Sequence, residues 1–418
     1  MVSNVDGQLY VWDERISRAE EAVQSAFARI DRISETNQIK VIQAFQAFKV
    51  SDFHFSGSTG YGYNDSGRET LENVYSHIFK TEAALVRPHF ASGTHTIACA
   101  LFGNVRPGER LLFIGGEPYD TLQKVIGKGN SHTGSLREWG IIVDIIPLLE
   151  DGHLDWPKIE AYFAEHHVKM VAIQRSRGYS LRPSLTIEVI RGITARVKQL
   201  QSDTIIFCDN CYGEFCETLE PTQVGVDLVA GSLIKNPGGG LAPTGGYIAG
   251  KAELVEQSAY RLTAPGIGGD VGATMNQMRL FFQGLFLAPV LVGQAIKGSI
   301  LASRVFADLG ISTSPAWDDV RTDLIQAIHF GDEHKLIKFV QSVQYSAPVD
   351  SHVRPEPWAM PGYEHPVIMA AGTFIQGGSL EMSADAPIRT PYVAFMQGGL
   401  TYSHVKWAIS KALITITG

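Results

Sequence analysis

The chain has 418 residues, of which 44% are hydrophobic and 19% are charged, and its formal net charge is -8. This composition excludes a disordered protein, and the length allows two domains or one large domain with an appendage. The acidic balance argues against nucleic acid or an anionic membrane surface as a partner.

The sequence has no run of 18 uncharged apolar residues, and its N-terminus lacks the basic-then-apolar pattern of a secretion signal. We therefore expect a cytoplasmic protein. Its four cysteines are too few for a disulfide framework in a chain of this length. Cys208 and Cys211 form a C-x-x-C pair, a spacing typical of metal or redox sites. No second pair or histidine cluster accompanies it, so we predict no metal site.

Residues 14–49 carry apolar side chains at helical spacing and contain neither proline nor glycine. We expect two amphipathic helices with a break near residues 34–37, where serine and asparagine suit a cap. Such an arm usually packs against another surface, and we expect that surface to belong to a partner subunit.

Residues 53–68 form a glycine-rich stretch that contains Tyr61 and Tyr63. Glycine permits unusual backbone dihedrals and close approach of the main chain to other groups. Composition alone leaves two interpretations open, an ordinary surface loop and a loop that binds a ligand.

Ser92, Gly93 and Thr94 lie in a turn of small residues that opens a predicted helix. The first amides of a helix are unpaired donors at the positive end of its dipole, and they bind phosphate well. A simple capping turn is the alternative. Tyr119 follows the next predicted strand, at residues 110–115, where its ring could lie on a cofactor and its hydroxyl could relay a proton.

Strands and helices alternate from residue 140 to residue 209. This alternation predicts an α/β fold with βαβ units, a mostly parallel sheet and helices on both of its faces. Arg177 follows the strand expected at residues 169–174. Its guanidinium suits a substrate carboxylate or a partner chain, and a solvated surface arginine is equally compatible with the pattern.

Asp209 ends a predicted buried strand at residues 203–209, and Lys235 follows the next apolar run. Residues at the carboxyl ends of strands in an open α/β sheet face the ligand crevice. An acid and a lysine in these places suit pyridoxal 5'-phosphate (PLP). The lysine binds the aldehyde carbon of the cofactor covalently, and the acid keeps the pyridine nitrogen protonated so that the ring draws electrons.

These residues also carry a family resemblance. Lys235 lies 26 residues after Asp209, within the motif GSLIKNP, and the upstream motifs read TGYGY, SGTHT and QRSRGY. Together they resemble the fold-type-I PLP enzymes of cysteine and methionine metabolism. Within that group they are most similar to the methionine γ-lyase-like proteins often labelled aluminium-resistance proteins, over roughly residues 10–418.

The resemblance implies a set of residues that contact the cofactor, namely Ser92, Gly93, Thr94, Tyr119, Asp209, Ser232 and Lys235. It also implies a homodimer or homotetramer with shared active sites, in which the loop at residues 59–63 crosses to the neighbouring subunit. Tyr61 is the first candidate to reach the cofactor phosphate there and Tyr63 the second. Tyr63 stands near the place of an arginine in the wider family, which leaves the role of each tyrosine open.

Three regions are predicted along the chain: a helical arm and loop (1–60), a large PLP-binding domain (61–285), and a linker helix with a smaller C-terminal α/β domain (286–418). In the last region we expect Arg389 on a strand. The resemblance makes it the arginine that holds the substrate carboxylate through two parallel hydrogen bonds. An exposed, salt-bridging arginine is the alternative.

The predicted function is that of a PLP-dependent carbon–sulfur lyase, with Lys235 and Tyr119 as catalytic residues. Its expected substrates are methionine-, homocysteine- or cystathionine-like amino acids. An aminotransferase of the same fold, a γ-lyase for a substrate without sulfur and a non-catalytic relative remain open. The residues indicate removal of the Cα proton, and they do not indicate which group leaves or whether elimination is β or γ.

Overall fold

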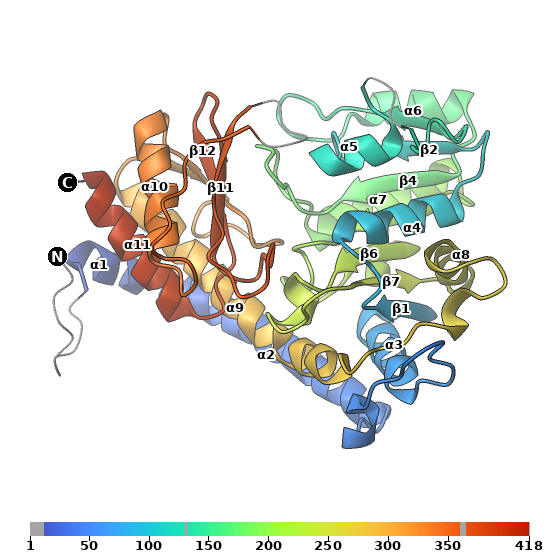
Figure 1. The fold of residues 1–418 in the computed structure, drawn as a ribbon. Coiled ribbons are helices and arrows are strands. Elements are labelled where there is room, and N and C mark those ends of the chain that lie inside the picture. Colours follow the sequence, from blue (N-terminus) through green and yellow to red (C-terminus); the bar gives the residue numbers. More distant parts are fainter. Residues whose placement is uncertain (1–11, 130–132, 360–364, 418) are drawn as a thin grey trace.

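The computed structural model describes residues 12–129, 133–359 and 365–417, and it contains two sheets flanked by helices (Figure 1). Strands β2 to β6 of the larger sheet run parallel, and β7 runs antiparallel to both of its neighbours. The sheet is therefore mostly parallel, as the sequence predicted. Its seven strands, in spatial order, are β1 (Ala83–Arg87), β7 (Gly246–Gly250), β6 (Leu228–Ser232), β5 (Ile205–Asp209), β4 (Met170–Gln174), β2 (Arg110–Phe113) and β3 (Ile142–Ile145).

Alternate residues of these strands enter two different apolar cores, one on each face of the sheet. Ile206 and Val229 join the main core, whereas their neighbours Phe207 and Leu228 join a second core. Because both faces of the sheet are covered, each strand is a continuous run of mostly apolar residues. Helices α3 (Ser66–Phe79), α6 (Trp156–Glu165) and α7 (Ile187–Leu200) cover the first face, and α4 (Gly93–Asn104), α5 (Asp120–Ile126) and α8 (Ala252–Leu262) cover the second.

The N-terminal arm consists of α1 (Glu14–Ala22) and α2 (Gln24–Ala47), so the predicted break near residues 34–37 is wrong. The polar residues at that point bond to other segments of the protein instead of capping a helix. Ser34 and Asn37 each donate a side-chain hydrogen bond of 3.0 Å to a main-chain carbonyl far along the chain. With no proline or glycine to stop it, α2 continues through these residues.

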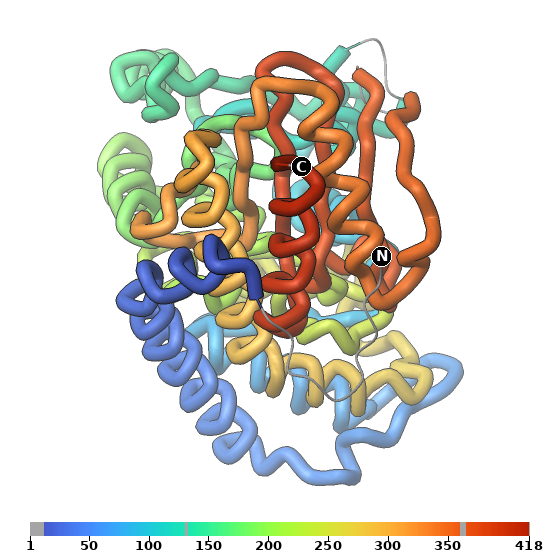
Figure 2. The backbone as a smooth tube through the Cα atoms, turned by 90° about the vertical axis from the view of Figure 1, so that its left-hand side faces the viewer, coloured from blue at the N-terminus to red at the C-terminus, as the bar shows by residue number. Residues whose placement is uncertain are grey.

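The arm packs on α9 (Met278–Asp308) of its own chain, whereas the sequence suggested a partner subunit. Lys297 pairs with Asp31 at 2.7 Å, and the rings of Phe45 and Phe282 meet edge to face with centroids 5.7 Å apart. Figure 2 shows the arm in blue along the outer edge of the molecule. The tertiary structure thus uses an apolar stripe of the arm to cover α9.

Helix α9 is also the single helix of the described residues that is long and apolar enough to cross a membrane. In its most apolar stretch, 67% of the residues are buried inside the protein. Its side chains join the main core together with residues of both sheets, which is the environment of a core helix. The predicted division between residues 285 and 286 falls inside this helix, and the division stays a prediction.

The smaller sheet is antiparallel throughout and lies beside the carboxyl ends of the large parallel strands (Figure 1). Even-numbered residues of its central strands, such as Ala384 and Met396, enter the main core against the helices behind the sheet. The other face turns toward the large domain. In spatial order the strands are β10 (Val367–Ala370), β11 (Ser383–Pro387), β12 (Val393–Gln397), β9 (Gln326–His329) and β8 (Ser312–Ser314), and the helices are α10 (Glu333–Tyr345) and α11 (Tyr402–Thr417).

Candidate active site

The N-terminus of α4 lies beside the end of β6 and forms one corner of the site. Ser92 caps the helix, because its Oγ accepts a hydrogen bond of 3.1 Å from the amide of His95. The amides of Gly93 and Thr94 have no partner among the described residues. A Cβ on Gly93 would lie 3.3 Å from the Cβ of Ser232, so a side chain there would fill the corner. The absence of that side chain leaves room for an anion against the free amides.

Asp209 ends β5 and is 4% exposed. Its Oδ1 accepts a hydrogen bond of 3.1 Å from the amide of Cys211. Burial raises the pKa of Asp209, and the hydrogen bonds from Cys211 and the charge of Lys235 oppose that rise. Among the described residues no cation lies within ion-pair distance of this carboxylate. A buried acid without such a partner suits a cationic group of a ligand.

Lys235 follows β6 and stands at the start of the short 3-10 helix Asn236–Gly238. Its Nζ lies 3.4 Å from the centre of the Tyr212 ring. Burial lowers the pKa of Lys235, but the neighbouring Tyr212, Cys211 and Asp209 outweigh burial and raise it overall. The amine is therefore held against an aromatic face at the same sheet edge as Asp209.

Tyr119 joins this group from the segment that follows β2. Its hydroxyl lies 3.0 Å from the Oγ1 of Thr94, and its amide donates to the Oε1 of Gln174 at 3.3 Å. Burial, followed by the charge of Asp209, raises the pKa of Tyr119. The hydroxyl consequently keeps its proton at neutral pH and can donate it.

The glycine-rich loop presents Tyr61 and Tyr63 to solvent, with side chains that are 74% and 60% exposed. The main chain beneath them is firmly held. Arg68 donates to the carbonyl of Gly62 at 2.7 Å, and the amide of Gly272 donates to the carbonyl of Tyr61 at 2.9 Å. Exposed aromatic rings on an anchored loop are typical of surfaces that another chain covers.

The two arginines predicted for the substrate lie outside this group. Arg177 is buried and donates from both terminal nitrogens to Ser314, at 2.9 and 3.0 Å, so that it links the large domain to β8. Arg389 was expected on a strand, and that placement is wrong. Strand β11 ends at Pro387, and Arg389 lies exposed in the turn before β12. The amide of Ile388 still donates to the carbonyl of Pro366 at 2.8 Å, but the amide of Arg389 turns back to the carbonyl of Pro387 at 2.9 Å, so the segment leaves the ladder there.

Tyr212 was missed at the sequence level, although it stands three residues after Asp209. Its backbone is left-handed, with a φ of 71°, which is rare for a bulky side chain and marks a strained position. The strain turns its ring onto the amine of Lys235. No local pattern marks this position, because a left-handed backbone at a bulky residue is not visible in the sequence.

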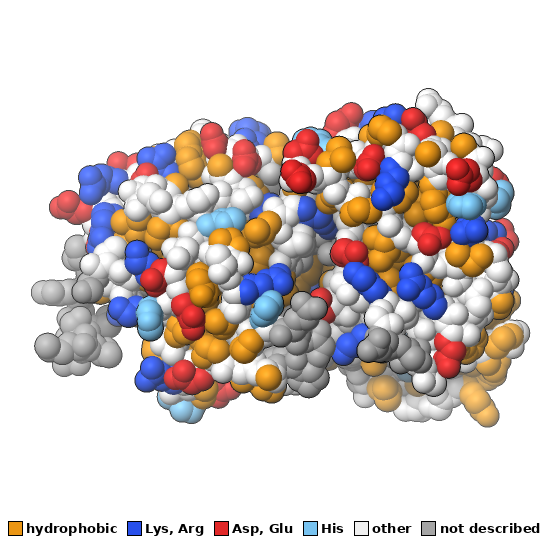
Figure 3. Space-filling model, turned by 90° about the horizontal axis from the view of Figure 1, so that it is seen from above, with side chains coloured by type: hydrophobic (Ala, Val, Ile, Leu, Met, Phe, Trp, Pro, Cys, Tyr) orange, Lys and Arg blue, Asp and Glu red, His pale blue; other side chains and the backbone are white. Residues whose placement is uncertain are grey.

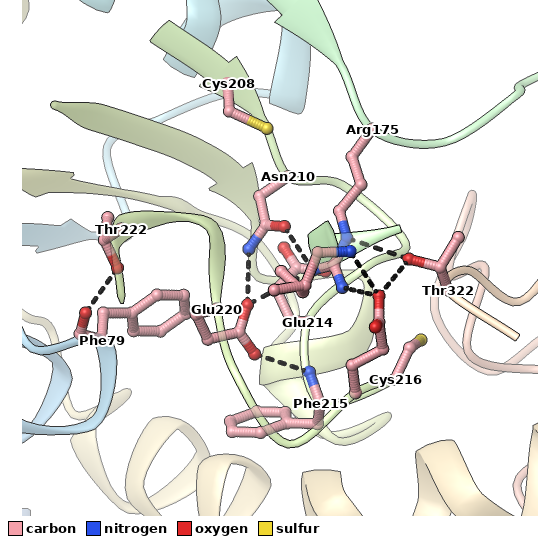
Figure 4. Close-up of polar contacts among 12 residues, drawn as sticks. Phe79, Arg175, Cys208, Asn210, Glu214, Phe215, Cys216, Glu220, Thr222 and Thr322 are labelled. Carbon is pink, nitrogen blue, oxygen red and sulfur yellow. Dashed lines mark hydrogen bonds and ion pairs between the residues drawn. The ribbon is translucent and has the colours of Figure 1, made fainter. Parts of the chain in front are cut away.

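A buried polar network supports this strained turn (Figure 4). The Arg175 side chain is fully buried and donates to Asn210 at 2.9 Å, and it forms ion pairs with Glu217 at 3.1 Å and Glu220 at 3.4 Å. Asn210 in turn donates to Glu220 at 3.1 Å. These bonds tie the turn after β5 to a rigid centre, because every member is partnered and all but the partly exposed Glu217 are buried.

Glu214 lies in the same buried region behind Gly231. Its Oε1 accepts a hydrogen bond of 2.8 Å from the hydroxyl of Tyr247, and its Oε2 has no partner in the described part of the chain. Burial raises the pKa of Glu214 to about 8. At neutral pH this residue is therefore mostly protonated, so an uncharged side chain packs against β6.

The cysteine pair is buried as free thiols. Cys211 borders the site: its Sγ would lie 3.7 Å from a Cβ placed on Gly93. Within residues 12–129, 133–359 and 365–417, no group of three or more His, Cys, Asp or Glu side chains is arranged to hold a metal ion.

Residues 12–417 match the family described as methionine gamma-lyase. The chain belongs to this family. An uncharacterized protein of Bacillus subtilis (strain 168), YnbB, is 52% identical over 386 residues, which cover 92% of this chain and 91% of that protein.

Solved structures agree with this assignment. A protein of Listeria monocytogenes, described as a candidate cystathionine β-lyase involved in aluminium resistance, is 52% identical and superposes with a TM-score of 0.94, covering 96% of this chain and 99% of that one. A Clostridium acetobutylicum protein with the same description is 48% identical, with a TM-score of 0.95 and coverage of 97% and 95%. YhfS of Escherichia coli, a protein described as PLP-dependent, shares the fold at 15% identity and a TM-score of 0.63.

Membership in the methionine gamma-lyase family confirms the resemblance inferred from the motifs, and the neighbours confirm the fold-type-I α/β architecture. By family, the chain is a carbon–sulfur lyase. The roles of its individual residues follow from the geometry described above.

Proposed function

We propose that Lys235 binds PLP covalently and that the enzyme removes a sulfur-containing leaving group from a methionine-, homocysteine- or cystathionine-like amino acid. One observation supports this most strongly: the amine of Lys235, the acid of Asp209 and the open corner at Gly93 converge from neighbouring elements of one sheet edge.

The donor set fits PLP part by part. The free amides at the start of α4, with the hydroxyls of Ser92, Thr94 and Ser232, suit a phosphate dianion. Asp209 is a buried carboxylate with no cation within ion-pair distance among the described residues, and a protonated pyridine nitrogen would satisfy it. Tyr119, hydrogen-bonded to Thr94, stands beside this phosphate corner.

PLP, when bound, supplies an electron-withdrawing ring that stabilises negative charge on the Cα of an amino acid. The protein's own groups then move the protons. We assign to the Nζ of Lys235 the removal of the Cα proton, and to Asp209 the task of holding a proton on the ring nitrogen. The Tyr119 hydroxyl, which keeps its proton because burial raises its pKa, donates to the departing sulfur.

For the substrate carboxylate we retain Arg389 as the candidate. Its side chain is exposed and makes no ion pair in the part of the chain that the structure describes. We assign Arg177 a role between the domains instead, because Ser314 occupies both of its terminal nitrogens.

We further propose a homodimer or homotetramer in which Tyr61 or Tyr63 completes the site of the neighbouring subunit. Both rings are exposed, and Tyr61 borders an open cavity of about 620 Å³ that Arg87 and His89 also line. Oligomers of this kind are usually symmetric, so each subunit offers its loop to the other. The free cysteines fit a reducing compartment, and we assign the protein to the cytoplasm.

The decisive experiment supplies the purified, PLP-loaded protein with L-methionine, L-homocysteine and L-cystathionine and measures ammonia and the released sulfur product, which is a thiol from the two thioethers and hydrogen sulfide from L-homocysteine. A lyase releases both in step. An aminotransferase yields a keto acid without ammonia. Absence of product from all three substrates, with cofactor bound, would reject the proposal.

A further inference from the structure

The face of the small sheet that turns toward the large domain carries unexpected polar residues. Side chains alternate across a strand, so residues of one parity share a face. Ala327 and Phe395 pair across β9 and β12, and both lie in a small apolar cluster with Tyr179 and Tyr212 of the large domain. This face therefore borders the hollow between the two lobes, which Figure 3 shows from above.

Asp385 and Gln397 stand on the same face. Asp385 pairs directly with Phe395 in the ladder, and Gln397 lies two residues beyond Phe395 on β12. Directly opposed residues in an antiparallel pair project to the same side. Asp385 thus points to the wall that Tyr212 and Lys235 approach from the large domain, and the charge of Lys235 acts on it.

The hydrogen bonds of these two residues are incomplete. The Oδ2 of Asp385 accepts from the hydroxyl of Tyr179 at 2.6 Å and from the Nε2 of Gln397 at 3.2 Å. Its Oδ1 has no hydrogen-bond partner among the described residues. The Oε1 of Gln397 is buried without a partner in the same described part of the chain. Asp385 is 3% exposed and Gln397 is 5% exposed, so both side chains lie largely out of water, where a polar atom normally has a hydrogen-bond partner.

The two oxygens are hydrogen-bond acceptors without partners among the described residues, and one of them belongs to an ionisable carboxyl group. Together they favour a ligand group that carries hydrogen-bond donors. A carboxylate would be repelled, and an apolar group would leave both oxygens without a hydrogen bond, which is unfavourable away from water. An ammonium group has three donors and a positive charge. It can therefore donate to both kinds of acceptor, and its charge complements that of the Asp385 carboxylate.

We propose that Asp385 and Gln397 form a subsite for an ammonium group of the amino-acid substrate, an assignment that rests on the proposed lyase function. The ammonium can come from two sources. It is either the second amino group of a diamino thioether, of which L-cystathionine is an example, or the α-amino group of any substrate on its way to Lys235.

Two matched probes separate the sources. S-(2-aminoethyl)-L-cysteine carries a terminal ammonium where S-propyl-L-cysteine carries a methyl group of similar size. We would measure the dissociation constant of each by titration calorimetry with PLP-loaded protein, in the Lys235→Ala background so that no turnover occurs. Because no product is needed, the result is readable even if the lyase assay fails, which keeps the two proposals separately testable.

Adding Asp385→Asn keeps the volume and the hydrogen bond from Tyr179 but removes the charge. We expect it to weaken binding of the aminoethyl probe by about 10- to 100-fold, the range for hydrogen bonds to charged groups. If the dissociation constant of the propyl probe does not change, the subsite binds a terminal ammonium. If both probes lose the same affinity while thermal stability is preserved, the subsite binds the α-ammonium.

Gln397→Met provides a second route if Asp385→Asn does not fold, and it should weaken the same probe several-fold. The proposal is overturned if neither substitution changes either dissociation constant. It is also overturned if both probes lose affinity only in step with a fall in the unfolding temperature, because Asp385 would then merely join the domains through Tyr179.

Discussion

The two sides of the site are built differently. The cofactor side comes from the edge of one buried sheet, where Lys235 and Asp209 end or follow adjacent strands and a network around Arg175 holds the turn between them. The proposed substrate side comes from the small sheet, where Asp385 and Gln397 each have an oxygen without a hydrogen-bond partner among the described residues. An extensive polar network holds one set of side chains in place, whereas acceptors without partners can select among ligands.

The largest effect is expected on the cofactor side, from Lys235→Ala. Without the amine, the covalent link to PLP cannot form and the Cα proton has no acceptor. Turnover and the visible absorption band of the linked cofactor should both disappear. If turnover or the absorption band persisted in a folded protein at saturating PLP, another lysine would carry the cofactor.

Asp209→Ala should lower kcat by about 100-fold or more, the cost of removing a preorganised electrostatic partner. Excess PLP should not restore the rate, because the lost function is retention of the ring proton. Steady-state assays across a range of PLP concentrations check this. A rate near that of the wild type would assign Asp209 a structural role.

The shared-site proposal predicts rescue between two inactive chains. Mixing Lys235→Ala with Tyr61→Ala should recover roughly a quarter of wild-type activity, since half of the dimers are mixed and one of their two sites combines both intact parts. Mixing with Tyr63→Ala tests the second tyrosine. If subunits exchange and the mixture stays inactive, the loop serves its own subunit or has no catalytic part.

Two substitutions of Tyr212 distinguish the contribution of its aromatic ring from that of its hydroxyl. The aromatic face stabilises positive charge on the Lys235 nitrogen by about 0.5–2 kcal/mol. Tyr212→Leu should therefore shift the pH transition of the visible band to lower pH and reduce kcat by about 2- to 30-fold, whereas Tyr212→Phe should stay close to wild type. Phe215→Leu, at another left-handed position, controls for damage to the turn. Equal behaviour of the Leu and Phe variants at position 212 would contradict a role for the ring.

The smallest effect on catalysis is expected from Glu214, whose influence is on stability. Its pKa rises from 4.5 to about 8 in the folded protein, so the folded state holds a proton that the unfolded state loses between these values. The stability it contributes is present below pH 4.5 and declines as pH rises toward 8. Glu214→Gln, which is neutral at every pH, should flatten this decline and raise the unfolding temperature at pH 8 by a few degrees. If the unfolding temperatures of the two proteins change in parallel between pH 5 and pH 8, Glu214 is not a buried neutral acid.

Local pattern predicted where Asp209 and Lys235 lie in the large sheet. A buried apolar run ending in an acid, and another followed by a lysine and a Pro-Gly turn, place Asp209 and Lys235 at neighbouring strand ends because the period of side chains and the rules of parallel sheets are local. The turn at Ser92 to Thr94 followed in the same way from small residues before a helix. The alternation of elements predicted the large sheet and its two layers of helices.

Only the tertiary structure decided the rest, because it depends on which distant surfaces meet. Ser34 and Asn37 have the composition of a cap, yet their bonds to remote carbonyls keep them inside α2. Arg389 falls in a turn because its amide bonds back to Pro387 and leaves the ladder, and Asp385 faces the large domain because of its register with Phe395. The position of Tyr212 depends on a left-handed backbone, and a polar network ties the turn that holds it to Arg175, which follows a different strand. Sequence determines local propensity, but the energy that overrides it comes from contacts that exist only after folding.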